Sequence, residues 1–274
     1  MKILITGAGS GIGRSTAFAL ARRGHTVIAT TRTQEQSDDL KGEAELQHLS
    51  IHTMKLDITK ESDRKKAAEH TPDILINNAA IGHSGPLVEI PLEYVRDSFE
   101  TNIFATLALT QALTQPMVKR RSGRIINISS VAGKMTLPYL GPYSMTKFAT
   151  EGMSDALRRE LAHHNVFVSI IEPGAFGTGF NEQMNKTKYM WFNKKSIFAK
   201  DALRIKAAEQ VIENAPKNVD SIVKTIIHAV EARRPKIRYI APFPSALRVF
   251  LSRILPDSIV DWGIEQRIKK HSKQ

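Results

Sequence analysis

Short apolar runs alternate with longer amphipathic stretches from residue 1 to about residue 180. The runs are rich in β-branched residues and span positions 2–6, 25–30, 73–76, 124–128 and 166–171, with another ending at Leu56. Runs this short and this continuously apolar are typical of strands buried on both faces of a parallel sheet. The alternation therefore predicts an α/β fold, with one doubly wound parallel sheet and helices on both of its faces.

Between the runs, apolar residues recur at helical spacing. We expect helices over 14–23, 92–120, 143–162 and 220–233, whereas the polar stretch 34–50 predicts only a short helix. A last strand is expected at 236–240. Beyond that strand, helical spacing continues in Phe243, Leu247, Phe250, Leu251, Ile254 and Leu255. No repeat or low-complexity linker interrupts the sequence, so a single domain over 1–274 is expected.

A glycine-rich turn, GAGSGIG at residues 7–13, separates the first strand from the first helix. Strand, glycine turn and helix in this order direct backbone N–H groups and the positive end of the helix at a phosphate. The turn therefore predicts a nucleotide-binding site. A flexible turn that binds nothing is the alternative. The residues expected to bind are Gly7, Ser10, Gly11, Ile12 and Gly13.

One hydroxyl, one phenol and one amine are brought together by the elements around residues 123–149. Ser130 follows the carboxyl end of a buried strand, and Tyr143 and Lys147 lie one helical turn apart, roughly 6 Å along the axis. A neighbouring ammonium favours the phenolate and lowers the pKa of the tyrosine. Tyr143 could then exchange a proton with a substrate oxygen that Ser130 holds. This is the chemistry that interconverts a carbonyl and an alcohol.

The spacing of Ser130, Tyr143 and Lys147, preceded by Asn-x-Ser-Ser at 127–130, resembles the active-site motif of the short-chain dehydrogenases/reductases. The resemblance covers residues 1 to about 180 and implies a Rossmann-type fold. It implies that Asn102 completes the catalytic set by supporting a water linked to the lysine, although Asn102 could merely stabilise a helix kink. It also implies that these residues bind the cofactor: Asp57, Ile58, Asn78, Ala79, Tyr143, Lys147, Pro173 and Thr178.

The end of the second strand indicates which cofactor is preferred. Enzymes that prefer NAD place a carboxylate near this position, whereas a nearby arginine accommodates the extra phosphate of NADP. Here the strand end offers Thr30, Thr31 and Arg32, and the first acidic residue after them is Glu35. We therefore expect NADP(H) to be preferred, with NAD(H) as the lesser alternative. A solvated Arg32 without a phosphate partner is the competing interpretation.

The last third of the chain lies outside the part that resembles the family. Residues 1–180 are expected to form the cofactor-binding and catalytic core, and 181–274 a helical substrate lid and C-terminal extension. The lid region carries Tyr189, Trp191, Phe192 and Phe198. Together with Ala-Thr-x-Arg at 29–32, the extension resembles the hydroxysteroid and retinol dehydrogenase branch, which implies an apolar carbonyl or alcohol substrate.

Several other classes of site are not indicated. The chain has no cysteine, and its nine histidines join no carboxylate cluster at metal spacing, so we expect no disulfide and no catalytic metal. There is no recognisable nucleic-acid motif. No apolar run reaches about 18 residues, and residues 1–10 lack the pattern of a signal peptide. A cytoplasmic protein is expected, and the resemblance implies a homodimer or homotetramer.

The net charge of +12 is concentrated in two segments. Residues 184–206 hold seven Lys or Arg against one acid, and residues 235–274 hold eight against three. Cations interleaved with apolar residues are typical of segments that bind a membrane surface. We therefore consider peripheral contact with an anionic membrane, against the alternative of a solvated basic face.

These observations predict an NADP(H)-dependent oxidoreductase that interconverts an alcohol and a ketone or aldehyde on an apolar substrate such as a steroid, a retinoid or a long-chain compound. The alternative is a binding module that senses NADP(H) on the same fold without turnover.

Overall fold

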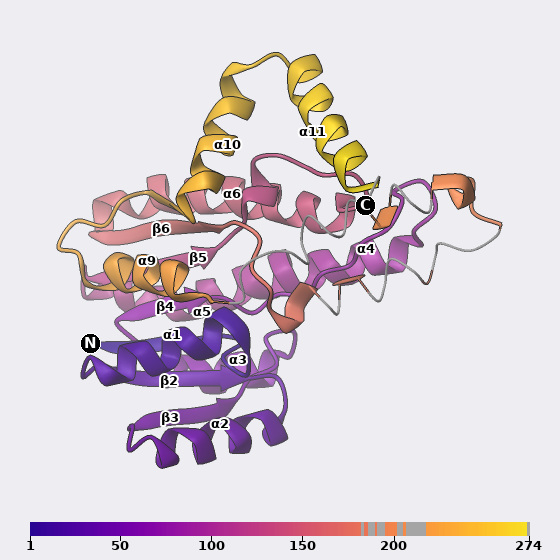
Figure 1. The fold of residues 1–274 in the computed structure, drawn as a ribbon. Coiled ribbons are helices and arrows are strands. Elements are labelled where there is room, and N and C mark those ends of the chain that lie inside the picture. The colour runs from indigo at the N-terminus through magenta and orange to yellow at the C-terminus, as the bar shows by residue number, and fades with distance from the viewer. Residues whose placement is uncertain (182–183, 186–189, 191–194, 202–204, 207–217, 273–274) are drawn as a thin grey trace.

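The computed structural model describes the chain except for residues 182–183, 186–189, 191–194, 202–204, 207–217 and 273–274. Seven parallel strands form one sheet in the order β3-β2-β1-β4-β5-β6-β7 (Figure 1). They are β1 (Lys2–Ile5), β2 (Thr26–Thr31), β3 (Ile51–Lys55), β4 (Ile74–Asn77), β5 (Gly123–Ile128), β6 (Val166–Pro173) and β7 (Arg238–Ala241). The predicted parallel sheet is confirmed.

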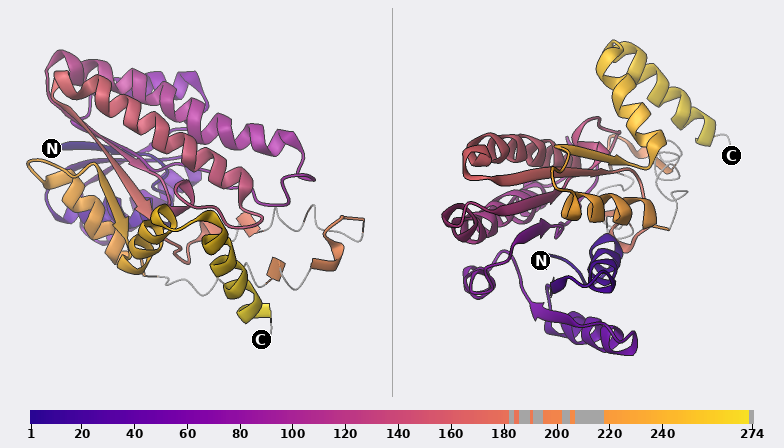
Figure 2. Two further views of the ribbon diagram at one scale, coloured as in Figure 1. Left: turned by 90° about the horizontal axis from the view of Figure 1, so that it is seen from above. Right: turned by 90° about the vertical axis from the view of Figure 1, so that its left-hand side faces the viewer.

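Helices cover both faces of this sheet (Figure 2). On one face, α1 (Gly11–Arg22), α2 (Gln34–Leu46) and α9 (Asp220–Glu231) pack through an apolar cluster that includes Phe18, Leu40 and Ile226. On the other, α3 (Glu61–Ala68), α5 (Thr106–Lys119) and α6 (Gly141–Leu161) contribute Ala67, Leu109 and Leu157 to a second cluster. The five inner strands run through nearly continuous buried residues because each of their faces meets one of these clusters, whereas the edge strands β3 and β7 are more exposed.

The strand order reverses direction between β1 and β4, since β2 and β3 lie to one side and β5 to β7 to the other. In a doubly wound sheet, the crevice outside the carboxyl ends of the strands at this point is where ligands bind. The fold therefore gathers the residues that follow β1, β4, β5 and β6 along one edge.

Three helices have bounds that differ from the predicted ones. The stretch predicted to form only a short helix contains α2, of 13 residues. A reciprocal capping box stabilises its start, because Thr33 Oγ1 accepts from Gln36 N at 3.2 Å and Gln36 Oε1 accepts from Thr33 N at 3.4 Å. The helix expected over 92–120 comprises α4 (Leu92–Phe99), a π-helical segment (Glu100–Ala105) and α5. The active-site helix α6 begins at Gly141, with Pro142 in its first turn.

The C-terminal apolar pattern forms two helices, α10 (Phe243–Ile254) and α11 (Asp257–Ser272). They are separated because Pro256 lacks an N–H and restricts the residue before it; Leu255 is extended, with φ −86° and ψ 146°. Figure 1 shows α10 and α11 (yellow) projecting from the sheet as a helical pair. Among the described residues, none of the helices combines the length and apolarity needed to cross a bilayer.

Part of the expected lid can be located. Phe198 lies edge-on to Tyr139, with ring centroids 6.0 Å apart. Tyr189, Trp191 and Phe192 lie outside the described residues.

Candidate active site

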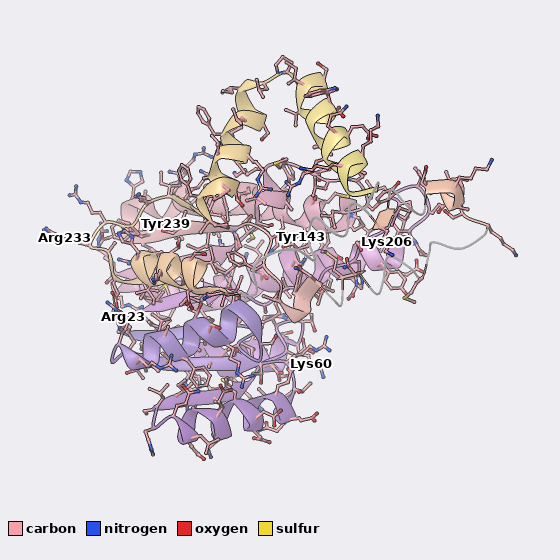
Figure 3. The ribbon with its side chains drawn as sticks, viewed as in Figure 1. Arg23, Lys60, Tyr143, Lys206, Arg233 and Tyr239 are labelled. Carbon is pink, nitrogen blue, oxygen red and sulfur yellow. The ribbon has the colours of Figure 1, made fainter. Side chains whose placement is uncertain are left out.

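A cleft of about 490 Å³ follows the carboxyl ends of the strands. Every residue predicted to bind the cofactor lines it: Gly7, Ser10, Gly11, Ile12, Gly13, Arg32, Asp57, Ile58, Asn78, Ala79, Tyr143, Lys147, Pro173 and Thr178. Figure 3 shows Tyr143 beyond the strand ends and beneath α10 and α11. The fold therefore brings together positions from six separate segments of the chain, although whether each of them binds a cofactor stays a prediction.

The glycine turn leaves space that side chains would fill. A Cβ at Gly7, where φ is +66°, would lie 2.8 Å from the Cα of Ala79. A Cβ at Gly13 would lie 2.4 Å from the carbonyl oxygen of Gly7. The first turn of α1 contains no acidic residue. A phosphate can therefore approach the free N–H groups at this helix end without repulsion, which fits a dinucleotide.

Asn78 holds the turn in place. Its Nδ2 donates to the carbonyl oxygens of Thr6 at 2.8 Å and Gly7 at 3.0 Å, and its backbone N–H donates to Thr6 Oγ1 at 3.0 Å. The side chain of Asn78 thus ties the end of β4 to the end of β1. Its amide is used within the protein, so Asn78 shapes the cleft through the backbone that it fixes.

The far end of the cleft contains Thr31, Arg32 and Gln36. Arg32 makes no hydrogen bond or ion pair with the part of the chain that the structure describes, so its guanidinium can meet a ligand. Asp57, predicted to bind the cofactor, also closes a local turn, because its Oδ1 accepts from Thr59 N at 3.1 Å and from Thr59 Oγ1 at 2.7 Å. Asp57 does not cap α3, because the N-cap of that helix is Lys60.

Ser130, Tyr143 and Lys147 meet in the middle of the cleft. Ser130 is buried, hydrogen-bonded to Tyr143, and accepts from Ala132 N at 3.1 Å. Lys147 is also buried; its Nζ donates to the carbonyl oxygen of Ile128 at 2.9 Å and lies 5.5 Å from the ring centroid of Tyr143. The three residues thus lie together beside the carboxyl end of β5, and their catalytic roles stay a prediction.

The electrostatics differ from the prediction that Lys147 lowers the pKa of Tyr143. Burial raises the pKa of the Tyr143 phenol to about 12, although the hydrogen bond with Ser130 opposes the rise. Burial also lowers the pKa of the Lys147 ammonium to about 8, against the attraction of Glu151. The prediction was wrong in direction because Nζ bonds to Ile128 and lies toward the ring, while desolvation of the phenol dominates. In the protein alone, Tyr143 holds its proton at neutral pH.

Asn102 lies in the π-helical segment, buried, and does not line the cleft. Its Oδ1 accepts from Ile81 N at 2.9 Å, and its Nδ2 donates to Ile81 O at 2.8 Å and to Thr146 Oγ1 at 3.1 Å. Asn102 therefore joins the loop after β4 to α6, directly before Lys147. Its predicted catalytic role stays a prediction.

A buried ionic cluster behind the site was missed by sequence reasoning. Lys134 and Arg238 lie among the carboxylates of Glu151, Asp155 and Glu172, with Arg238 Nη2 at 2.9 Å from Asp155 Oδ2 and Arg238 Nε at 3.3 Å from Glu172 Oε1. Burial, together with Glu151, raises the pKa of Glu172 to about 7. In the sequence, the only sign of this cluster was the position of Glu151, which lies on the same helical face as Tyr143 and Lys147.

A second pocket, of about 770 Å³, adjoins the cleft. The two share Ser130, Tyr143, Gly174, Phe180 and Asn181. Apolar residues of α10, α11 and the segment 131–140 form most of its wall. The glycine turn lines the cleft but not this pocket, whereas Tyr143 and Ser130 line both, so the geometry suits two ligands that meet at Tyr143.

Comparisons with known proteins agree with this geometry. The family model for short chain dehydrogenase matches residues 1–189. An NADPH-dependent 3-dehydrocapnine reductase from Ornithobacterium rhinotracheale is 32% identical over 99% of this chain and 98% of its own length. Retinol dehydrogenase 8 of Bos taurus is 30% identical over 86% of this chain and 80% of its own length. A solved short-chain dehydrogenase from Streptomyces avermitilis superimposes with a TM-score of 0.78 at 27% identity, covering 100% of this chain and 98% of that one.

Proposed function

The chain belongs to the short-chain dehydrogenase/reductase family of oxidoreductases, and we propose that it interconverts a carbonyl and an alcohol on an apolar substrate with NADP(H) as cofactor. One observation carries the proposal: Ser130 and Tyr143 lie where the glycine-lined cleft and the apolar pocket meet. A redox cofactor in the first and an apolar substrate in the second would both reach these two side chains.

In the proposed mechanism, the phenol of Tyr143 donates its proton to the carbonyl oxygen of the substrate, and the hydroxyl of Ser130 hydrogen-bonds to the same oxygen. A bound reduced nicotinamide supplies the hydride. Lys147 would stabilise the charge left on Tyr143 and would bind ribose hydroxyls of the cofactor. Burial raises the pKa of the phenol to about 12, so Tyr143 carries at neutral pH the proton that the reduction direction needs.

The cofactor preference rests on Arg32 and on the cleft around it. A guanidinium can bind a phosphate monoester through two hydrogen bonds, and Arg32 stands at the strand end without a competing ion pair in the described chain. The relative from Ornithobacterium rhinotracheale is named for its dependence on NADPH. We therefore propose NADP(H) as the preferred cofactor and NAD(H) as a weaker one.

Residues 181–274 are proposed to cover the substrate, and the outer surfaces suggest two further contacts. Phe243, Phe250 and Trp262 are 79%, 59% and 64% exposed on α10 and α11, which supports peripheral contact with an anionic membrane from the cytoplasmic side. On the opposite side, Phe104 and Phe148 are 57% and 49% exposed beside α5 and on α6, which supports a homodimer or homotetramer.

The proposed reaction is tested by measuring NADPH oxidation by the purified protein with a panel of ketones and aldehydes graded in size and polarity. We expect turnover of long apolar carbonyl compounds that Tyr143→Phe abolishes. The alternative, a module that senses NADP(H) without turnover, predicts that NADPH binds but that no panel member makes the protein oxidise NADPH faster than Tyr143→Phe does.

A further inference from the structure

Ser130 begins a short turn over residues 130–134, the serine turn, most of which is a single turn of 3₁₀ helix. Its backbone is closed on itself, since Gly133 N donates to Ser130 O at 2.9 Å. Apart from the contact of Ser130 with Tyr143, the one hydrogen bond or ion pair that joins the serine turn to α6 within the described chain comes from the side chain of Lys134. Lys134 is therefore the part of the turn that can fix its distance from the helix.

The serine turn and α6 are packed without a side chain between them. A Cβ on Gly133 would lie 2.8 Å from the carbonyl oxygen of Lys147, closer than the main chain of the helix allows. The turn thus lies directly against the part of α6 that carries Lys147. Because this contact is made by main chain on both sides, any retreat of the turn would separate Ser130 from Tyr143.

Lys134 extends from the end of the serine turn into the buried ionic cluster. Its Nζ pairs with Glu151 Oε2 and lies 3.7 Å from Glu172 Oε1. The three side chains are only 8%, 7% and 1% exposed, so water screens their charges little. Glu151 lies one helical turn beyond Lys147, and Glu172 directly precedes Pro173 at the cleft. Lys134 therefore connects the serine turn to α6 and to β6 at once.

Arg238 of β7 faces the same two carboxylates. Its Nε lies 3.2 Å from Glu151 Oε2 and 3.3 Å from Glu172 Oε1. Two cations thus meet two carboxylates at this point. Without Lys134, the two buried carboxylates would share one guanidinium, which destabilises the cluster. Arg238 cannot take over the anchoring of the serine turn, because it belongs to another strand.

We propose that Lys134 is a positioning residue for the reaction: by anchoring the serine turn to Glu151, it holds the hydroxyl of Ser130 within hydrogen-bonding reach of the Tyr143 phenol. The effect on the reaction rests on the proposed function, whereas the placement of Ser130 rests on contacts within the protein alone. Lys134 lines neither the cleft nor the apolar pocket, so a change at Lys134 reaches the site only through the elements that it connects.

The placement can be measured without turnover. Labelling with tyrosine that carries ¹³C at Cζ gives one resonance for each of the five tyrosines, and Tyr143→Phe identifies the one that belongs to Tyr143. Ser130→Ala then shows how this resonance moves when the hydrogen bond to the phenol is lost. Lys134→Met should move it in the same direction, because the turn loses its anchor. Lys134→Arg, which keeps the charge and the donors, should leave it near its wild-type position.

Arg158→Gln is the matched control. Arg158 Nε lies 3.5 Å from Asp155 Oδ1, at the side of the ionic cluster away from the serine turn. This variant also removes a cation from the cluster, but it does not touch the anchor, so the Tyr143 resonance should not move. Unchanged NADPH affinity verifies that each variant is folded. A resonance that Ser130→Ala or Lys134→Met leaves in place, or that Arg158→Gln moves as far as Lys134→Met does, would overturn the proposal.

A double variant separates anchoring from charge balance. Lys134→Met combined with Glu151→Gln removes one cation and one carboxylate, so the remaining carboxylate keeps its guanidinium. Urea unfolding should show the double variant more stable than Lys134→Met, since no excess buried charge is left. The Tyr143 resonance should stay displaced, because the turn still lacks its anchor. A resonance that returns to the wild-type position would show that Lys134 acts through charge balance alone and would overturn the anchoring role.

The kinetic arm separates this inference from the function on which it rests. With NADPH and a carbonyl compound that the wild type reduces, Lys134→Met should lower kcat roughly ten- to a hundredfold through misplacement of Ser130, whereas Lys134→Arg should keep most of kcat. No turnover of any compound by the wild type would refute the proposed reductase, and the resonance of Tyr143 would still decide on the anchor. An unchanged kcat in Lys134→Met would refute the positioning role and leave the reductase supported.

Discussion

Gly13→Ala tests whether the glycine turn is shaped for close approach of the backbone. Gly13 is the third residue of α1 and is buried. An added Cβ would lie 2.4 Å from the carbonyl oxygen of Gly7 and 2.4 Å from Nδ2 of Asn78, between two atoms that now share a 3.0 Å hydrogen bond. Neither can move freely, because Gly7 is main chain and the Asn78 amide also bonds to Thr6. The helix must therefore shift away from the turn.

Forcing a methyl into a packed site costs roughly 1–3 kcal/mol, and Ala in place of Gly within a helix recovers up to about 1 kcal/mol. Gly42→Ala in α2 is the matched control, since nothing lies within 4 Å of its added Cβ. Equilibrium urea unfolding should thus show Gly13→Ala less stable than Gly42→Ala by about 1–3 kcal/mol. NADPH titration should show at least a roughly tenfold weaker affinity for Gly13→Ala alone, the equivalent of about 1.4 kcal/mol. Two variants with the same stability and the wild-type NADPH affinity would refute the close approach and the phosphate site together.

Four other expectations follow from the same structure. Tyr143→Phe should keep NADPH affinity and lose at least about 100-fold in turnover, measured by steady-state kinetics; turnover near the wild-type rate would contradict the proton donor. Arg32→Ala should weaken NADPH far more than NADH in parallel titrations, and equal losses would show that Arg32 reads no phosphate. Because burial raises the pKa of Glu172 to about 7, above its ordinary value, its contribution to the free energy of unfolding is present at low pH and is lost as the pH rises through about 7. Glu172→Gln should remove that loss, by up to about 3 kcal/mol between about pH 5 and about pH 8, in urea unfolding; an unchanged pH profile would show that Glu172 stays ionised. Sedimentation with anionic vesicles should show binding at low salt that weakens as salt rises, and no binding at low salt would exclude the membrane contact.

Local signals explain what the sequence predicted well. Each strand is a short apolar run, and parallel strands place their carboxyl ends at one edge, so the turn at 7–13 and Ser130, Tyr143 and Lys147 could be placed near one another before the fold was known. The length of α2 and the break at Pro256 were also readable, since Thr33-x-x-Gln36 is a capping pattern and proline ends a helix. The capping pattern of α2 was overlooked because residues 34–50 show little apolar periodicity. The break at Pro256 was overlooked because apolar residues recur at helical spacing up to it.

Burial was the quantity that the sequence did not supply. From the spacing alone, a lysine one turn from a tyrosine lowers the pKa of the phenol; in the folded chain the desolvation of the phenol outweighs that charge, and Lys147 is directed to Ile128. The sequence likewise gave little indication of the ionic cluster around Glu172, because that cluster depends on the fold. Its charges come from the turn after β5, from α6, from β6 and from β7, and only the sheet order brings those segments together.

The same limit changes how the basic C-terminal segment is interpreted. Counted along the sequence, residues 235–274 present eight basic residues to a possible membrane. In the structure, Arg238 lies within the ionic cluster, whereas Arg248 and Arg267 border the apolar pocket and stay exposed. The charge left for the outer surface is therefore only slightly smaller than the sequence suggests, and the exposed side chains of Phe243 and Phe250 add an apolar part to that surface. Since the apolar part of a membrane contact is not screened by salt, vesicle binding should retain a component that high salt does not remove, and replacing Phe243 and Phe250 by serine should abolish that component.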